Sequence, residues 1–190
     1  MVRVKSLHNK KKGLTLIELM VVIVIIGIMA TIVIPNLRRS SPNQQRKEFI
    51  SYLNALSLYA MQRAVQMNKT QEVAFDIKNR TLLLKQQGRV IPGRSTEFEP
   101  VKSSFLKTEF HWSPHISFKN IFINGEDKMT IQQKLTETWF FITPEGIAQE
   151  VIINAVDKND KQEGAKGHQF SLVLNPFTVQ FKEYDTFQKP

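Results

Sequence analysis

The amino-acid sequence predicts an α+β chain, in which a long N-terminal helix packs on an antiparallel β domain made of two small sheets. Three observations lead to this fold class. Residues 14–34 form an apolar run with a single charge, residues 49–67 repeat apolar side chains at three- and four-residue steps, and the remaining chain alternates short apolar strands with turn residues. Many short strands separated by turns indicate antiparallel sheets and disfavour a wound α/β fold.

Composition limits the function classes. At roughly 150 residues per domain, 190 residues amount to one globular domain and an additional segment. The absence of cysteine excludes disulfides, thiolate zinc sites, iron–sulfur clusters and a cysteine nucleophile. The net charge is +9, but residues 1–13 carry five cations and no acid, and the rest has 21 basic against 17 acidic side chains. Nucleic acid is therefore not an expected partner.

The apolar run from Leu14 to Ile34 predicts a membrane-spanning helix over residues 14–35. A helix of this length extends about 30 Å, the thickness of the hydrocarbon core of a bilayer, and it has no polar face. The cations precede the run, which places residues 1–13 in the cytoplasm and the following domain outside it. Pro35 and Asn36 follow the run where a signal peptide would carry a small-residue cleavage site, so an ordinary signal peptide is disfavoured.

Glu18 is the one charged residue within this apolar run. A carboxylate in the middle of a membrane helix costs about 2.5–3.5 kcal/mol on insertion scales, so it requires an explanation. One interpretation is that Glu18 reaches the interface or is protonated. The other is that an ammonium neutralises it, because cleavage after Gly13 would leave a new α-amino group on Leu14, one helical turn away.

The segment Lys-Gly-Leu-Thr-Leu-Ile-Glu at residues 12–18, with its basic leader and apolar run, resembles the class III signal of type IV pilins and type II secretion pseudopilins. The resemblance implies that a prepilin peptidase cuts between Gly13 and Leu14 and methylates Leu14. It also implies that Glu18 sets the register between subunits of a filament. Glycine at the cut is reasonable, since it has no Cβ to obstruct an extended backbone in a protease cleft. The family most often has Phe where this chain has Leu14.

Gly27 and Pro35 interrupt the same helix. Proline lacks an amide hydrogen and clashes with the preceding turn, which predicts a bend near Ile34. In filaments of the resembling family the stretch between an equivalent glycine and proline can unwind, and Gly27 to Pro35 corresponds to it by position. An intact helix with a mild kink is the alternative for a lone subunit.

A second, amphipathic helix is expected over residues 36–69. Ser41 can cap it with Pro42 at its first position. Its apolar stripe is expected to pack on the sheets of the same chain, and consists of Phe49, Leu53, Leu56, Ala60, Ala64 and Met67. The polar side chains are assigned mostly to other faces, and these are Arg46, Lys47, Gln62 and Arg63.

Residues 70–190 are expected to form the β-rich domain. The predicted strands are 73–77, 81–84, 98–101, 116–118, 121–123, 138–142, 148–153, 169–174 and 178–182, with residues 86–115 otherwise irregular. Trp139 and the apolar residues after it are interpreted as a buried strand in preference to a base-stacking surface.

Three segments resemble the domain of the H-type minor pseudopilins. They are the helix sequence at residues 49–64, the segment 138–153 and the closing strand pair. The resemblance implies a structural component of a periplasmic pseudopilus, anchored once in the inner membrane with its C-terminal domain in the periplasm. Its expected partners are the prepilin peptidase, other pseudopilins contacted through their N-terminal helices, the inner-membrane assembly platform, membrane lipid and secreted exoproteins. The alternatives are a minor type IV pilin that acts in pilus assembly or DNA uptake, and an uncleaved single-span anchor with a ligand-binding domain.

Catalytic chemistry is not expected, and neither is a cofactor or metal. His111 and His115 have a metal-compatible helical spacing, but Pro114 lies between them and breaks a helix. The acidic stretch 157–164 has its glycine misplaced for a calcium loop and carries lysines among the acids. We therefore expect a loop pair of histidines and a solvated turn.

Overall fold

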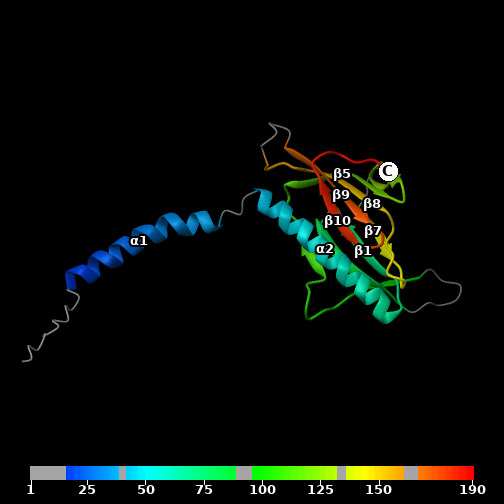
Figure 1. The fold of residues 1–190 in the computed structure, drawn as a ribbon, viewed down its shortest axis with the longest axis horizontal. Coiled ribbons are helices and arrows are strands. Elements are labelled where there is room, and N and C mark those ends of the chain that lie inside the picture. The colour runs from blue at the N-terminus through cyan, green and yellow to red at the C-terminus, as the bar shows by residue number, and fades with distance from the viewer. Residues whose placement is uncertain (1–15, 39–41, 89–95, 132–135, 161–166) are drawn as a thin grey trace, which may run out of the picture. The chain divides into compact units, whose positions relative to one another are not determined.

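The computed structural model describes residues 16–38, 42–88, 96–131, 136–160 and 167–190 (Figure 1). The chain divides into two compact units, Met1–Ser40 and Ser41–Pro190. The described part of the first unit is one helix, α1 (Leu16–Arg38). All other elements belong to the second unit, which is an α+β domain.

The second unit begins with helix α2 (Pro42–Met67), whose first residue is the proline that the sequence places there. Its expected apolar stripe is confirmed except at the last position, where Met67 is 51% exposed because the helix ends there. The fully buried members are Phe49, Leu53, Leu56, Ala60 and Ala64. The expectation for Arg46 is wrong: this side chain lies three residues before Phe49, shares its helix face and is buried.

The first sheet runs in the order β3-β2-β1-β7, with β4 also paired to β2. Its strands are β1 (Gln71–Asp76), β2 (Thr81–Gln87), β3 (Phe98–Pro100), β4 (Glu109–His111) and β7 (Glu137–Ile142). All its pairs are antiparallel. The turn of the β1–β2 hairpin is fixed by Asp76, whose carboxylate accepts hydrogen bonds from the backbone and side chain of Asn79 at 2.8 and 2.7 Å.

The second sheet runs in the order β10-β9-β8-β5-β6 and is also antiparallel. Its strands are β5 (Ile116–Ile123), β6 (Glu126–Asp127), β8 (Val151–Asp157), β9 (His168–Asn175) and β10 (Gln180–Tyr184). A four-residue helix, α3 (Lys128–Ile131), follows β6. The prediction of two antiparallel sheets is thus confirmed.

Several strand boundaries differ from those expected. Residues 116–123 form one strand where the sequence suggests two, because an irregularity between Phe118 and Asn120 shifts the register within a continuous pairing with β8. Strand β4 lies inside the stretch expected to be irregular. Residue Ala148, the expected start of a strand, makes only an isolated bridge to Ile142. The range of β8 instead follows its pairing with β5, which runs from Val151 to Asp157.

One core joins α2 to both sheets, and in Figure 1 α2 lies over β1 and β10. At its centre, Phe75 meets Phe118 edge to face with ring centroids 6.0 Å apart, and Phe49 meets Trp112 at 6.0 Å. Strand β7, expected to be a buried strand, is buried on one face only. It is an edge strand whose alternation buries Phe140 and leaves Trp139 45% exposed.

Candidate functional site

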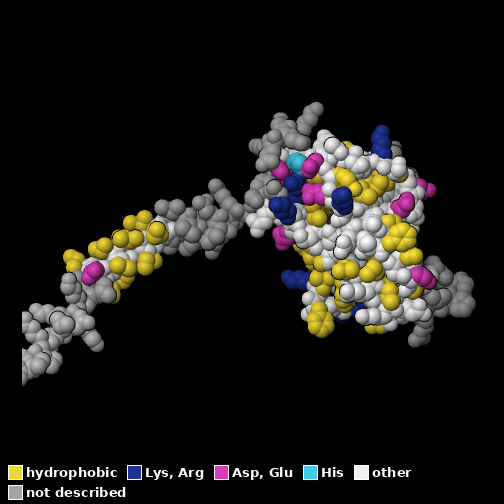
Figure 2. Space-filling view, viewed as in Figure 1, with side chains coloured by type: hydrophobic (Ala, Val, Ile, Leu, Met, Phe, Trp, Pro, Cys, Tyr) yellow, Lys and Arg dark blue, Asp and Glu magenta, His cyan; other side chains and the backbone are white. Residues whose placement is uncertain are grey.

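The described residues of α1 present apolar side chains to solvent around the helix (Figure 2). Leu16 is 79% exposed and Ile17 71%, although the helix consists almost entirely of aliphatic residues. A helix that is apolar on all sides needs lipid or other helices around it. Within the described residues, no helix combines the length and the apolarity needed to cross a membrane.

Glu18 lies in the first turn of α1 and is exposed. Gly13 and Leu14, the expected cleavage and methylation positions, lie outside the described residues, as does the expected cap Ser41.

The backbone of α1 is helical through both Gly27 and Pro35. A Cβ added at Gly27 would meet no atom within 4 Å. Packing within the described part of α1 therefore does not require a glycine at that position. The unwinding expected for filaments is not tested by the isolated chain and stays a prediction.

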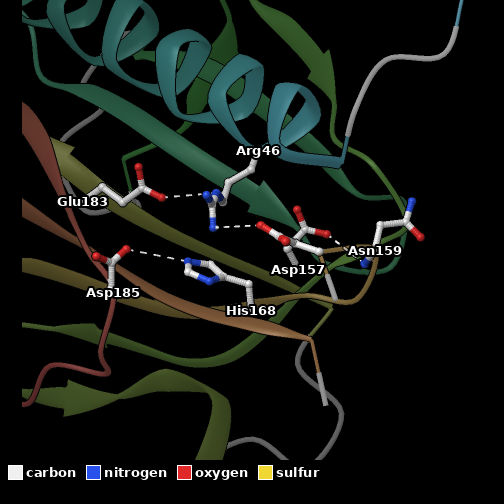
Figure 3. Close-up of polar contacts among 7 residues, drawn as sticks. Arg46, Asp157, Asn159, His168, Glu183 and Asp185 are labelled. Carbon is white, nitrogen blue, oxygen red and sulfur yellow. Dashed lines mark hydrogen bonds and ion pairs between the residues drawn. The ribbon is translucent and has the colours of Figure 1, made fainter. Parts of the chain in front are cut away.

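Arg46 is the centre of a charged cluster at the start of α2 (Figure 3). Its Nε lies 3.3 Å from Glu183 Oε1 on β10, and its Nη1 lies 3.8 Å from Asp160 Oδ2, just beyond β8. The guanidinium also stacks over the Phe170 ring of β9 at 5.6 Å from its centroid. One side chain of α2 thereby contacts the ends of β8, β9 and β10.

The polar residues around Arg46 extend this cluster along the sheet end. His168 Nε2 lies 3.6 Å from Asp185 Oδ1, and the Asp157 carboxylate accepts a hydrogen bond of 3.0 Å from the amide of Asn159 (Figure 3). Asp157 is 1% exposed. These contacts fix the N-terminal turns of α2 to the second sheet. We call the group the Arg46 cluster, and its members are Arg46, Asp157, Asn159, Asp160, His168, Glu183 and Asp185.

A second charged cluster lies on the first sheet. Lys85 Nζ is 3.1 Å from Glu72 Oε1 and 2.5 Å from Glu137 Oε1, so β1, β2 and β7 are joined by one ammonium. Burial raises the pKa of Glu72, and the Lys85 ammonium opposes that rise. Burial lowers the pKa of Lys85, but its hydrogen bonds to the two carboxylates outweigh this effect and raise it overall.

His111 and His115, the two histidines considered as possible metal ligands, do not come together on a helix. His111 is exposed on β4, whereas His115 is half-buried in the turn that follows, and its carbonyl accepts a hydrogen bond from the Lys158 amide. Among the residues described, no three His, Cys, Asp or Glu side chains group together as metal ligands. Residues 161–164 of the acidic stretch lie outside the described part.

Comparison with known proteins connects this chain to prepilin-like proteins. Residues 8–34 match the family described as the prokaryotic N-terminal methylation motif. The chain is 28% identical over 99 residues to type II secretion system core protein G of Escherichia coli K12, covering 52% of this chain and 63% of that protein. It is 45% identical over 48 residues to core protein G of Klebsiella pneumoniae, covering 25% of this chain and 34% of the relative. The matches thus span less than two thirds of these relatives.

Among solved structures, the minor pseudopilin EpsH from the type II secretion system of Vibrio cholerae is similar with a TM-score of 0.49 and 10% identity, over 73% of this chain and 94% of that one. The methylation motif and the sequence relatives make the chain similar to type IV pilin-like proteins. More particularly, it is similar to the core pseudopilins of type II secretion systems.

Proposed function

We propose that this protein is a minor pseudopilin of a type II secretion system, a structural subunit of the periplasmic pseudopilus that drives folded proteins across the outer membrane. The observation that carries the proposal is the methylation motif at residues 8–34. The same chain is also similar in sequence to type II secretion core proteins. The role is mechanical and not enzymatic. Within the pseudopilins, the H-type resemblance of the helix and the last strands favours a minor subunit over the major one.

Maturation begins at the leader. The basic residues 1–13 stay in the cytoplasm, and a prepilin peptidase cuts between Gly13 and Leu14 and methylates the new amino terminus. The motif match includes both residues, which supports this step. Cleavage removes five cations and leaves an ammonium one helical turn before Glu18.

Anchoring and assembly use the same apolar helix. Residues 14–35 span the inner membrane once, with the second unit in the periplasm. The exposed aliphatic side chains of α1 are covered by lipid before assembly and by neighbouring N-terminal helices afterwards. Because both surroundings are apolar, the charge pair between the Leu14 ammonium and Glu18 of a neighbour supplies the register that packing alone would not define.

Gly27 and Pro35 serve the assembled state. The open space around Gly27 within the described part of α1 leaves room for a neighbouring helix, which supports this assignment. A neighbouring helix can approach closely at glycine, and the stretch up to Pro35 can unwind in the filament. The assembly platform and other pseudopilins are the direct partners, with exoproteins as cargo.

The experiment uses a strain that lacks this protein, complemented with the full chain. Mass spectrometry of the purified protein is expected to find an N-terminus at Leu14 that carries one methyl group, and secretion of the exoproteins is expected to return. Gly13→Val blocks the peptidase site and should abolish both results, whereas Gly88→Ala, far outside the motif, should leave the N-terminus mature. Purified protein that still carries Met1 contradicts the proposal, and so does a chain that restores pili without restoring secretion. The second result would favour the minor type IV pilin.

A further inference from the structure

The loop between β3 and β4, residues 101–108, carries the most exposed large hydrophobic side chain of the described part of the second unit. Phe105 is 95% exposed, whereas its neighbour Leu106 packs against the core. The neighbouring residues at the tip are polar or charged, so Phe105 is an isolated apolar projection and not part of an apolar face.

The loop has a defined conformation, because hydrogen bonds fix both of its sides. The hydroxyl of Ser103 accepts hydrogen bonds from the amides of Phe105 and Leu106 at 3.2 and 3.4 Å. The hydroxyl of Thr108 donates to the carbonyl of Val101 at 2.5 Å, which closes the loop at its base. With Leu106 inside, these bonds hold Phe105 outside.

Two lysines, Lys102 and Lys107, flank the tip, and both are exposed. Together with four other residues they line a hollow of about 390 Å³ beside the loop, and these four are Ser103, Thr108, Glu109 and His111. Glu109 is the one carboxylate in this lining, and its Oε1 lies 3.9 Å from His111 Nε2. The hollow therefore offers two ammonium groups and the Ser103 hydroxyl, donors that a phosphate prefers. The Thr108 hydroxyl does not count among them, because it donates to the Val101 carbonyl.

We propose that this loop, the Phe105 tip, docks on the surface of a bilayer that contains anionic phospholipid, with Phe105 among the acyl chains and a phosphate head group beside Lys102 and Lys107. The chemistry matches on both counts, since an aromatic side chain flanked by cations suits the boundary between acyl chains and negative head groups. This inference rests on the proposed function, which keeps the second unit next to the inner membrane.

A lipid surface fits this tip better than a protein does. A stable protein interface buries about 800 Å² per partner around an apolar centre, and here only one apolar side chain projects from lysine and serine neighbours. One phenylalanine and two lysines bind a membrane only weakly by themselves. Anchoring through α1 makes the second contact intramolecular, at an effective concentration in the millimolar range, and a weak contact then suffices.

Quenching by brominated phospholipid in vesicles that hold the full chain tests this docking. The Phe105→Trp variant reports on the tip, and its matched control is Phe177→Trp. Phe177 is 77% exposed in the β9–β10 turn with no charged residue within two positions. Subtracting the fluorescence of the wild-type chain corrects for the emission of Trp112 and Trp139. We expect bromolipid quenching at position 105 in vesicles with phosphatidylglycerol, and none at position 177.

Charge is tested in the same vesicles by adding Lys102→Gln and Lys107→Gln to Phe105→Trp. The tip-docking equilibrium should fall about fivefold for each lysine, and it should fall likewise in purely neutral vesicles. Equal quenching at positions 105 and 177 overturns the docking, and so does a blue-shifted emission at position 105 that bromolipid does not quench, which would indicate a protein pocket. Flotation of the chain with the vesicles reports the α1 anchor separately, so loss of the anchor and loss of the tip contact are distinguishable.

Discussion

The side-chain amide of Asn54 on α2 binds both backbone groups of Phe181 on β10. Asn54 Nδ2 donates to the Phe181 carbonyl at 3.2 Å, and the Phe181 amide donates to Asn54 Oδ1 at 2.6 Å. Strand β10 is an edge of the second sheet. The amide of Asn54 therefore takes the place of a neighbouring strand at Phe181 and protects this part of the edge from pairing with another chain.

Removal of this side chain should destabilise the second unit. Asn54→Ala loses both hydrogen bonds and should lower the free energy of unfolding by about 1–3 kcal/mol. Asn54→Asp keeps the acceptor but sets a carboxylate against the Phe181 carbonyl, so it should also destabilise. Urea unfolding followed by the emission of the buried Trp112 measures the change. Gln62→Ala, on an exposed position of the same helix, should change stability by less than about 0.5 kcal/mol.

The same arrangement recurs at Asn154, and it shows where sequence reasoning stops. The side-chain oxygen of Asn154 accepts a hydrogen bond from the amide of Gln188 in the C-terminal tail at 3.2 Å, and its side-chain nitrogen donates to the Gln188 carbonyl at 2.9 Å. Gln149 is a partial case, since its side-chain oxygen accepts from the Phe141 amide at 2.9 Å while its backbone amide donates to the Phe141 carbonyl at 3.1 Å. An amide side chain in a sequence indicates a turn or a surface, and nothing local shows which distant backbone it will bind.

What the sequence predicted well depends on periodicity over many residues. The stripe of α2 and the two-sheet architecture follow from burial patterns, which a sequence displays directly. Arg46 was misplaced because a lone charged residue is assigned to solvent by its chemistry, although its spacing of three from Phe49 put it on the buried face. Strand β4 was missed because three residues with alternating polarity carry too little pattern to separate them from a loop.

The Arg46 cluster should contribute strongly to the stability of the second unit. Arg46→Met removes the cation and leaves the Asp160 and Glu183 carboxylates without it. Removing one partner of a buried ion pair costs about 3–5 kcal/mol, and here about 2–4 kcal/mol is expected because Glu183 is 32% exposed. Lys47→Met makes the same substitution on the adjacent exposed residue and should be nearly neutral. Equal unfolding midpoints for the two variants would show that the cluster contributes nothing.

The stability of the second unit should decline at alkaline pH. Burial, and to a smaller extent the Glu109 carboxylate, raises the pKa of Tyr52 above 10.0, and the pKa of Lys85 is raised above 10.5. The folded state therefore holds these protons after the unfolded state has lost them, so stability is complete below about pH 10 and is lost as the pH rises further. Tyr52→Phe keeps the stacking on Phe110 and should reduce the slope above pH 10 without changing it at pH 7. An unchanged alkaline slope in this variant contradicts the assignment to Tyr52.

Two glycines with the same backbone conformation should respond differently to alanine. Gly125 and Gly167 have φ of +82° and +79°, so alanine costs about 1–2 kcal/mol at either position. At Gly125 the added Cβ has open space, with its nearest neighbour, a Pro190 atom, at 4.0 Å. At Gly167 it would lie 2.6 Å from the backbone oxygen of Asp157, which cannot move without disturbing the start of the β8–β9 pairing. Gly167→Ala should therefore destabilise at least twice as much as Gly125→Ala in the same unfolding experiment.

The last prediction separates maturation from assembly. Glu18→Ala leaves the proposed cleavage site at Gly13 and Leu14 unchanged, so mass spectrometry should still find a processed and methylated N-terminus. Without the carboxylate, the Leu14 ammonium of a neighbouring subunit has no partner in apolar surroundings, and pull-down with the other pseudopilins should recover much less of the variant. Thr31→Ala is a suitable control, because the Thr31 hydroxyl donates only to the Ile28 carbonyl of its own helix at 2.7 Å. Incorporation of Glu18→Ala at the level of this control would mean that helix packing alone sets the register.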